Sequence, residues 1–101
     1  MTRLNLLREA IESVDERLIA AIGERMQLVR AAGREKADVG APVLDPAREA
    51  AVVSRASALA RASGLPQDEI RALFWRLIAM SRRVQLDDRS KARPDVDATS
   101  G

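Results

Sequence analysis

The stretch LNLLREAIESVDERLIAAIGERMQLVRAAGREK, residues 4–36, determines the fold available to this 101-residue chain. Seven of its apolar residues recur at helical spacing, in steps of three or four as far as Ile22 and then a step of seven: Leu4, Leu7, Ile11, Val14, Leu18, Ile22 and Val29. No proline interrupts the stripe, so the spacing predicts one helix from about residue 4 to residue 36. At 1.5 Å per residue it would be roughly 50 Å long, which is more than a small monomeric domain needs.

A second helix is predicted where Asp45-Pro46 places an N-cap residue before a first-turn proline. It should run over residues 46–62 with a set of apolar residues facing inward: Val52, Val53, Ala56, Leu59 and Ala60. Ser63-Gly64-Leu65-Pro66 ends it, and Pro66 opens a third helix, whose apolar pattern stops at Asp87. The sequence therefore predicts an all-α domain over residues 1–90 and a disordered tail over 91–101.

Three helices of such unequal length do not close a core by themselves. The first helix has surplus apolar surface along its full length, and pairing with a second copy of the chain would cover it. We therefore expect a homodimer.

Composition narrows the classes of function. Cysteine and histidine are both absent, which excludes disulfides, thiol chemistry and the commonest general base and metal ligand. The 17 basic residues are interspersed with 15 acidic ones, whereas a nucleic-acid-binding domain more often gathers its basic residues in a patch. No apolar run approaches the ~20 residues of a membrane span, and no signal-peptide core follows the N-terminus. We expect a cytoplasmic protein that binds neither nucleic acid nor membrane.

Seven polar side chains lie on the predicted apolar stripes instead of the solvated faces of the helices. They are Arg25, Lys36, Asp45, Arg48, Glu49, Ser81 and Gln85. Burying a charge without a partner is costly, so such groups normally stay in water. Seven of them on the inward faces of one small chain indicate a pocket for an anionic ligand.

Two of the cations are spaced to hold such a ligand at both ends. Arg25 and Lys36 are eleven residues apart, which on a helix means ~16 Å in height but only ~20° in direction. Arg8 is roughly 25 Å from Arg25 along the same helix and ~100° round it. It is badly placed for the pocket of its own chain, but in an antiparallel dimer it could enter the pocket of the other subunit.

Each of these residues also has an ordinary structural explanation. Asp45 is a helix N-cap on any account, Lys36 could complement the dipole at a helix C-terminus, and the others could be surface or helix-end groups. Together they would be seven independent coincidences. With Arg8 included, the set carries four positive and two negative charges. The positive excess suits a dianion, because arginine forms paired hydrogen bonds with carboxylates.

These residues and their spacing resemble those of the small all-helical chorismate mutases, over about residues 4–88. The matching segments are Leu7-Arg8-Glu9-Ala10-Ile11, Val14-Asp15, Glu24-Arg25, Lys36, Pro42-Val43-Leu44-Asp45, Arg48-Glu49, Leu73-Phe74, Ser81 and Gln85. No single element is specific, but the full set at matched spacing is. The resemblance implies an intertwined homodimer with two identical sites, built from three helices per chain.

The resemblance also implies an activity, the pericyclic rearrangement of chorismate to prephenate in aromatic amino-acid biosynthesis, which the shikimate pathway feeds. This isomerase reaction needs no cofactor, metal or covalent intermediate. Lys36 and Gln85 would donate hydrogen bonds to the ether oxygen, which becomes partly negative as the C–O bond breaks. Arg25 would hold a carboxylate of the substrate. With Lys36 and Gln85 it makes up the catalytic set that the resemblance implies.

The remaining site residues would bind the dicarboxylate substrate. Arg8 of the partner subunit would hold a carboxylate, assisted by Arg48 and Ser81. Asp45 and Glu49 would address the ring hydroxyl.

Other functions stay open on this scaffold. Isochorismate-pyruvate lyases and aminodeoxychorismate mutases use the same scaffold. Asp45 is an acceptor suited to a ring hydroxyl and favours chorismate, although a ring ammonium would also donate to this carboxylate. A non-catalytic helical dimer or regulatory module is the alternative from another class. Docking to another enzyme of aromatic biosynthesis is also open.

Overall fold

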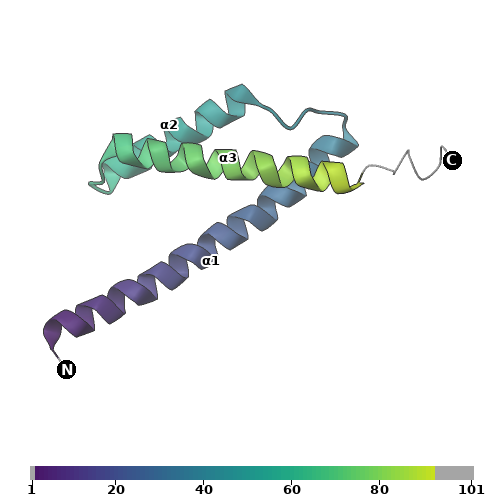
Figure 1. Cartoon of the computed structure of the whole chain (residues 1–101). Helices are drawn as coiled ribbons and strands as arrows, with labels where there is room; N and C mark the ends of the chain where they lie inside the picture. Colours follow the sequence, from purple (N-terminus) through teal and green to yellow (C-terminus); the bar gives the residue numbers. More distant parts are fainter. Residues whose placement is uncertain (1, 93–101) are drawn as a thin grey trace.

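The computed structural model describes residues 2–92, which form three helices joined by two short connections (Figure 1). α1 spans Arg3–Asp38, α2 spans Pro46–Ala62 and α3 spans Gln67–Ala92. The predicted all-α class, with one long N-terminal helix and two shorter ones, is confirmed for this part of the chain.

The helix ends follow from local chemistry. The hydroxyl of Thr2 caps α1 by accepting a 3.1 Å hydrogen bond from the backbone N–H of Asn5. Asp45 caps α2 as predicted, since its carboxylate accepts a 3.2 Å hydrogen bond from the backbone N–H of Arg48. After α1 and α2 the chain turns at Gly40 and Gly64, whose φ angles of 70° and 69° suit glycine and strain other residues.

The end of α3 differs slightly from expectation. The helix continues to Ala92, two residues beyond the boundary expected at residue 90. Arg89 and Lys91 lie in its last turn, where positive charge stabilises a helix C-terminus, and the next proline is Pro94. The rest of the expected tail, residues 93–101, lies outside the described residues.

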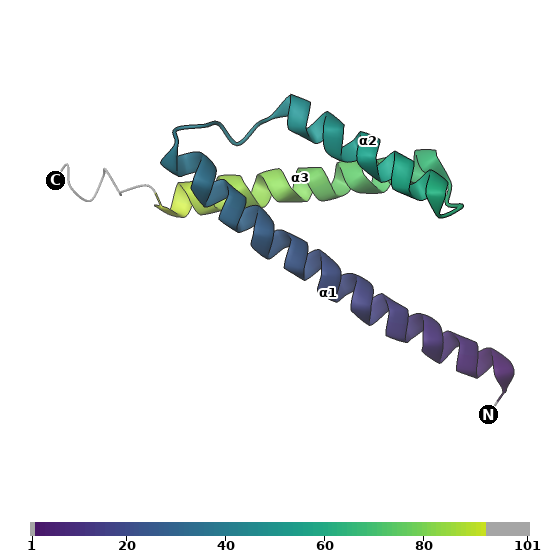
Figure 2. The ribbon, with the colours of Figure 1, turned by 180° about the vertical axis from the view of Figure 1, so that it is seen from behind.

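α3 packs against both other helices, and the chain is elongated, with extents of 68 × 33 × 17 Å. Figures 1 and 2 show the N-terminal half of α1 projecting away from the α2–α3 pair. Within residues 2–92, no helix combines the length and the apolarity that crossing a membrane would require.

The core is small and lies mainly between α2 and α3. Its buried apolar residues are Val43, Val53, Ala56, Ala60 and Ile78. Leu59, predicted to face inward, is instead 54% exposed. It lines a groove together with Arg55 of α2 and Phe74 of α3. Helix periodicity places it within one turn of the core, but the packing of α2 on α3 leaves more than half of this residue exposed.

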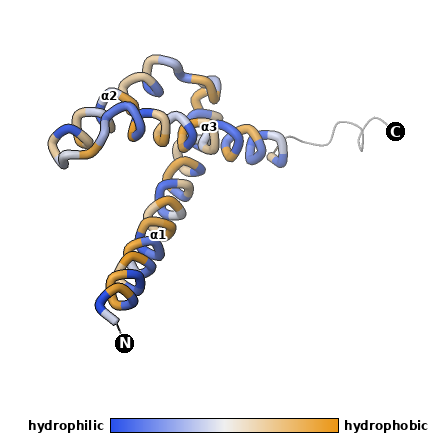
Figure 3. The backbone as a smooth tube through the Cα atoms, turned by 60° about the vertical axis from the view of Figure 1, so that its left-hand side comes forward, coloured by the Kyte–Doolittle hydropathy of each residue, from blue (hydrophilic) through white to orange (hydrophobic). Residues whose placement is uncertain are grey.

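None of the residues of α1 is buried. The predicted apolar stripe is exposed over the projecting half of the helix, where Leu4, Leu7, Ile11, Val14 and Leu18 are each between 49% and 59% exposed. Figure 3 shows hydrophobic residues recurring along α1 as far as its free end. The surplus apolar surface predicted from helix length is therefore present.

Replacing Gly23 by alanine should stabilise the protein. A Cβ at this position in α1 would meet no atom within 4 Å. Alanine has the higher helix propensity, so the free energy of unfolding should rise by up to about 1 kcal/mol. Urea denaturation at fixed protein concentration measures the change; a decrease would show that another group occupies this space.

Candidate active site

A cavity of about 340 Å³ lies between the C-terminal half of α1, the start of α2 and α3. All seven polar residues predicted to line a pocket line this one: Arg25, Lys36, Asp45, Arg48, Glu49, Ser81 and Gln85. Arg8 does not line it and lies exposed on the projecting half of α1, as expected for its own chain.

Arg25 and Ser81 join α1 to α3 on one wall of the cavity. Nη1 of Arg25 donates a 2.8 Å hydrogen bond to Oγ of Ser81. The Ser81 hydroxyl in turn donates to the backbone oxygen of Leu77, also at 2.8 Å. The serine therefore uses its proton within its own helix and offers lone pairs to the guanidinium, which fixes the direction of Arg25.

Lys36 lies on another part of the wall. Its ammonium donates to the backbone oxygen of Val43 and to Oε1 of Gln85, each at 3.1 Å. A lysine ammonium has three N–H donors. Within the described part of the chain, two are engaged, which leaves the third for a ligand.

Gln85 is buried, with 7% exposure, where α3 meets α1. Its Nε2 donates to the backbone oxygen of Val29 at 2.8 Å, while Oε1 accepts from Lys36. An amide nitrogen carries two hydrogens, so the second can serve a ligand. Gly33 allows the close approach of the two helices, because a Cβ there would lie 3.0 Å from Cγ of Gln85.

The start of α2 supplies the opposite wall. Asp45 and Arg48 are exposed at the rim, and Asp45 keeps its cap bond to the backbone of Arg48. Glu49 is more enclosed, and both of its oxygens accept hydrogen bonds from Arg82 of α3, at 2.7 Å and 2.8 Å. The hydrogen bond to Glu49 raises the pKa of Arg82 above its ordinary value, loss of solvation opposes the shift, and the charge of Glu49 adds to it.

Arg82 is a cavity residue that the sequence analysis missed. It follows Ile78 by four residues and precedes Gln85 by three, so it lies on the same helical stripe as both. The helical spacing that selected Ser81 as a pocket residue would have selected Arg82 as well. Arg89 does not line the cavity, but its Nη2 donates to the backbone oxygen of Ala41 at 3.0 Å and ties the first connection to α3.

A second hollow, of about 830 Å³, lies on the outer side of α2 and α3 beside Trp75. Three of its polar groups are engaged with one another: Arg71 donates to Ser57 at 2.7 Å, and Ser57 donates to Gln67 at 3.0 Å. Arg71 also pairs with Asp68. These polar groups do not converge on open space, so the smaller cavity is the better candidate site. Among the described residues, no group of histidine, cysteine and acidic side chains could hold a metal ion.

The chain matches the family described as chorismate mutase type II over residues 7–86, which is most of its length. It belongs to that family. The matched range includes every polar residue of the cavity, together with Arg8.

Curated relatives of this chorismate mutase type II chain carry several names. A T-protein from Enterobacter agglomerans is 33% identical over 81 residues, which is 80% of this chain but 22% of that protein. A 3-dehydroquinate dehydratase from Pyrobaculum aerophilum is 34% identical over 83 residues, 82% of this chain and 24% of that protein. An isochorismate pyruvate lyase from Pseudomonas aeruginosa is 36% identical over 77 residues, 76% of this chain and 75% of that protein. The chain thus spans less than a quarter of the first two relatives and three quarters of the third.

Replacing Gly33 by alanine should destabilise the protein, in contrast to the same change at Gly23. The new methyl group would press on Cγ and Cδ of Gln85, which is held by Val29 and Lys36 and has little freedom to move. Overpacking should lower the free energy of unfolding by roughly 1–3 kcal/mol. The higher helix propensity of alanine should offset up to about 1 kcal/mol of that loss.

The Q85A background provides the control, since it removes the atoms that the methyl group would meet. The penalty of G33A, measured by urea denaturation, should largely disappear there. An equal penalty in both backgrounds would assign the cost to something other than Gln85.

Proposed function

We propose that this chain is a cytoplasmic chorismate mutase, which rearranges chorismate to prephenate. The observation that carries the proposal is the arrangement of the cavity, where Arg25 with Ser81 and Lys36 with Gln85 face one space from two walls. The substrate has two carboxylates, a ring hydroxyl and an ether oxygen, and the cavity offers cations, acceptors and donors for each. Membership of the family supports the same assignment.

The first contribution to rate would be orientation. The enolpyruvyl arm of chorismate is flexible and must fold over the ring before the new C–C bond can form. Arg25 would hold one carboxylate, and because Ser81 fixes its direction the arm would be held in a reactive conformation. Holding reacting atoms in such a conformation lowers the barrier by removing the entropy cost beforehand.

The second contribution would be electrostatic. The ether oxygen gains negative charge only as the C–O bond breaks, so donors placed there bind the transition state more tightly than the substrate. The third N–H of Lys36 and the second amide hydrogen of Gln85 are suited to that position, since the two groups are 3.1 Å apart. Asp45 and Glu49 would face the ring hydroxyl at the other wall, where one of the two carboxylates would accept its single proton.

Lys36→Ala and Gln85→Ala should each lower kcat by about 10²- to 10³-fold, the usual cost of losing one preorganised donor. KM should change much less, because these donors act chiefly in the transition state. Steady-state kinetics on chorismate, with prephenate identified by NMR, measures both.

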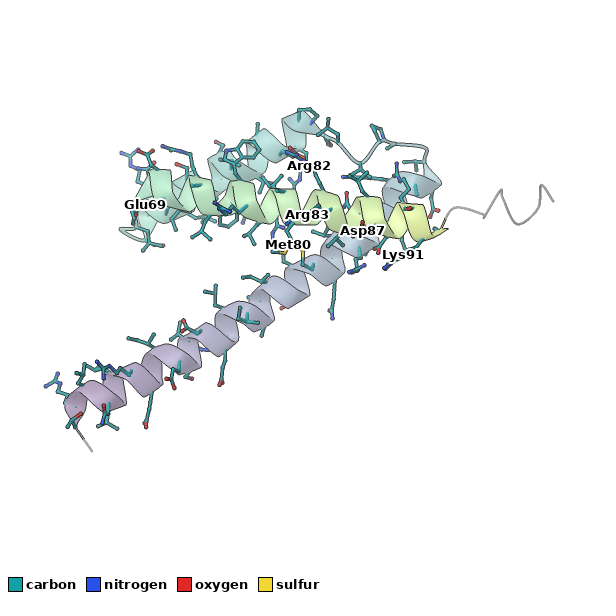
Figure 4. The ribbon with its side chains drawn as sticks, in the orientation of Figure 1. Glu69, Met80, Arg82, Arg83, Asp87 and Lys91 are labelled. Atoms are coloured by element: carbon teal, nitrogen blue, oxygen red, sulfur yellow. The ribbon has the colours of Figure 1, made fainter. Side chains whose placement is uncertain are left out.

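Matched controls are K91A and Q27A, which remove the same side chains at exposed positions; Figure 4 shows Lys91 near the end of α3. Wild-type kcat in K36A or Q85A, with only weaker binding, would refute the role given to that residue.

A second candidate is isochorismate-pyruvate lyase activity in the same cavity. The Pseudomonas aeruginosa relative of that name matches this chain over 75% of its length. Incubation with isochorismate would yield pyruvate and salicylate if this candidate is right. Conversion of neither isochorismate nor chorismate would favour a non-catalytic helical dimer.

We further propose that the active form is an intertwined homodimer with the two α1 helices antiparallel. The exposed apolar stripe from Leu4 to Leu18 supports this arrangement, because a second copy of the chain would cover it. Covering it would bury apolar surface that the small core of one chain cannot supply. The same arrangement would bring Arg8 of the partner subunit to the open side of the cavity, where a second carboxylate needs a cation.

Mixing two inactive variants tests this dimer directly. R8A and K36A homodimers should each be nearly inactive, since every site lacks one essential cation. After joint refolding, half of the dimers are mixed, and each mixed dimer has one intact site because Arg8 and Lys36 come from different chains. Activity should therefore recover to about a quarter of the wild-type value. If Arg8 served the site of its own chain, mixing would restore nothing.

A further inference from the structure

The pair formed by Glu49 and Arg82 has a defined geometry within the cavity. Nε and Nη2 of Arg82 donate to the two different oxygens of Glu49, at 2.7 Å and 2.8 Å. The Glu49 side chain is 13% exposed and that of Arg82 is 39% exposed. Figure 4 shows Arg82 where α3 runs beside α2. A bidentate contact of this kind holds the carboxylate in one orientation.

The contact leaves Glu49 able to bind a ligand. Each carboxylate oxygen has two lone pairs, and Arg82 uses one on each. A hydrogen-bond donor on the ring of a bound substrate can still be accepted. The charge of Glu49 is, however, compensated by a guanidinium in direct contact, and arginine keeps its proton at any pH at which proteins fold.

The charges around the cavity therefore differ from those predicted without Arg82. Four cationic side chains line it within one chain: Arg25, Lys36, Arg48 and Arg82. Two acidic side chains, Asp45 and Glu49, oppose them. The excess is two positive charges within one chain, and Arg8 of the partner subunit would raise it to three in the proposed dimer. A substrate with two carboxylates and no cation compensates more of this excess than one that also carries a ring ammonium, which would in addition bring that ammonium close to Arg82.

We propose that Arg82 is a positioning residue that sets substrate specificity, holding Glu49 as a charge-compensated acceptor that selects a neutral ring hydroxyl over a ring ammonium. The inference rests on the proposed mutase function and deepens it, because chorismate and 4-amino-4-deoxychorismate differ at this substituent. An unpaired Glu49 would serve either substituent, and for an ammonium its full charge would be an advantage. Arg82 removes that advantage.

The experiment compares kcat/KM for chorismate and for 4-amino-4-deoxychorismate in wild type, R82Q, R82M, R82K and R83Q. R82Q replaces the charged side chain with a polar one, and R82M replaces it with an apolar one. Circular dichroism and thermal unfolding show which variant is folded, and one folded variant of the two is enough for the comparison. The ratio of kcat/KM should shift toward the aminated substrate by about tenfold or more, the scale of one charge interaction at a partly exposed site.

Two controls separate charge from packing. R82K keeps the positive charge and should keep the ratio near the wild-type value, even though the bidentate contact is lost. R83Q removes a positive charge from the next residue of α3, which is exposed, and should leave the ratio unchanged. In an E49Q background, R82Q should shift the ratio far less, because Arg82 acts through Glu49.

The outcomes distinguish this inference from the proposed function. If the wild type converts chorismate and R82Q and R82M leave the ratio unchanged, the role of Arg82 is wrong while the mutase function stands. Preference of the wild type for the aminated substrate would also overturn it. Conversion of neither substrate by the wild type would refute the proposed function itself.

Discussion

The structure depends on one buried amide, that of Gln85. An amide that loses its water and gains no partner costs a few kcal/mol, so α1 and α3 can meet only in a register that satisfies it. Val29 and Lys36 of α1 provide that register, and Gly33 leaves the space for the side chain. Once it is set, Arg25 lies opposite Ser81, and Arg30 pairs with Asp88 further along the same two helices. The site and the helix packing are therefore specified by the same contacts.

The same contacts serve the site and the helix packing because the apolar core is small. The buried apolar residues are two alanines, two valines and an isoleucine, and none of them is aromatic. Such a core contributes little beyond the α2–α3 contact, so the attachment of α1 relies on polar contacts that also line the cavity. Substitutions of site residues should therefore affect stability as well as chemistry. The proposed dimer would relieve this dependence by adding apolar burial along α1.

The matched segment makes up three quarters of one relative and less than a quarter of two others, so similar sequence occurs in proteins of very different length. A reaction that needs only orientation and a few fixed charges suits a compact unit of this kind, because each contributing group is one side chain on a rigid helix. Differences in substrate can then arise from single positions on the cavity wall. Arg82 adds a positive charge to the cavity that the pocket predicted from the sequence did not include.

Much of the fold and of the site follows from the sequence by itself. The bounds of α2, the Asp45 cap and the gathering of seven polar residues around one cavity were predictable, because helix periodicity and capping depend on residues within one or two turns of each other. Periodicity assigns a residue to a face, but it does not say what lies opposite that face. The exposure of Leu59 and the pairing of Glu49 with Arg82 depend on how α2 and α3 are rotated about their own axes. That rotation is decided by tertiary packing between residues distant in sequence, since no local rule relates position 49 to position 82.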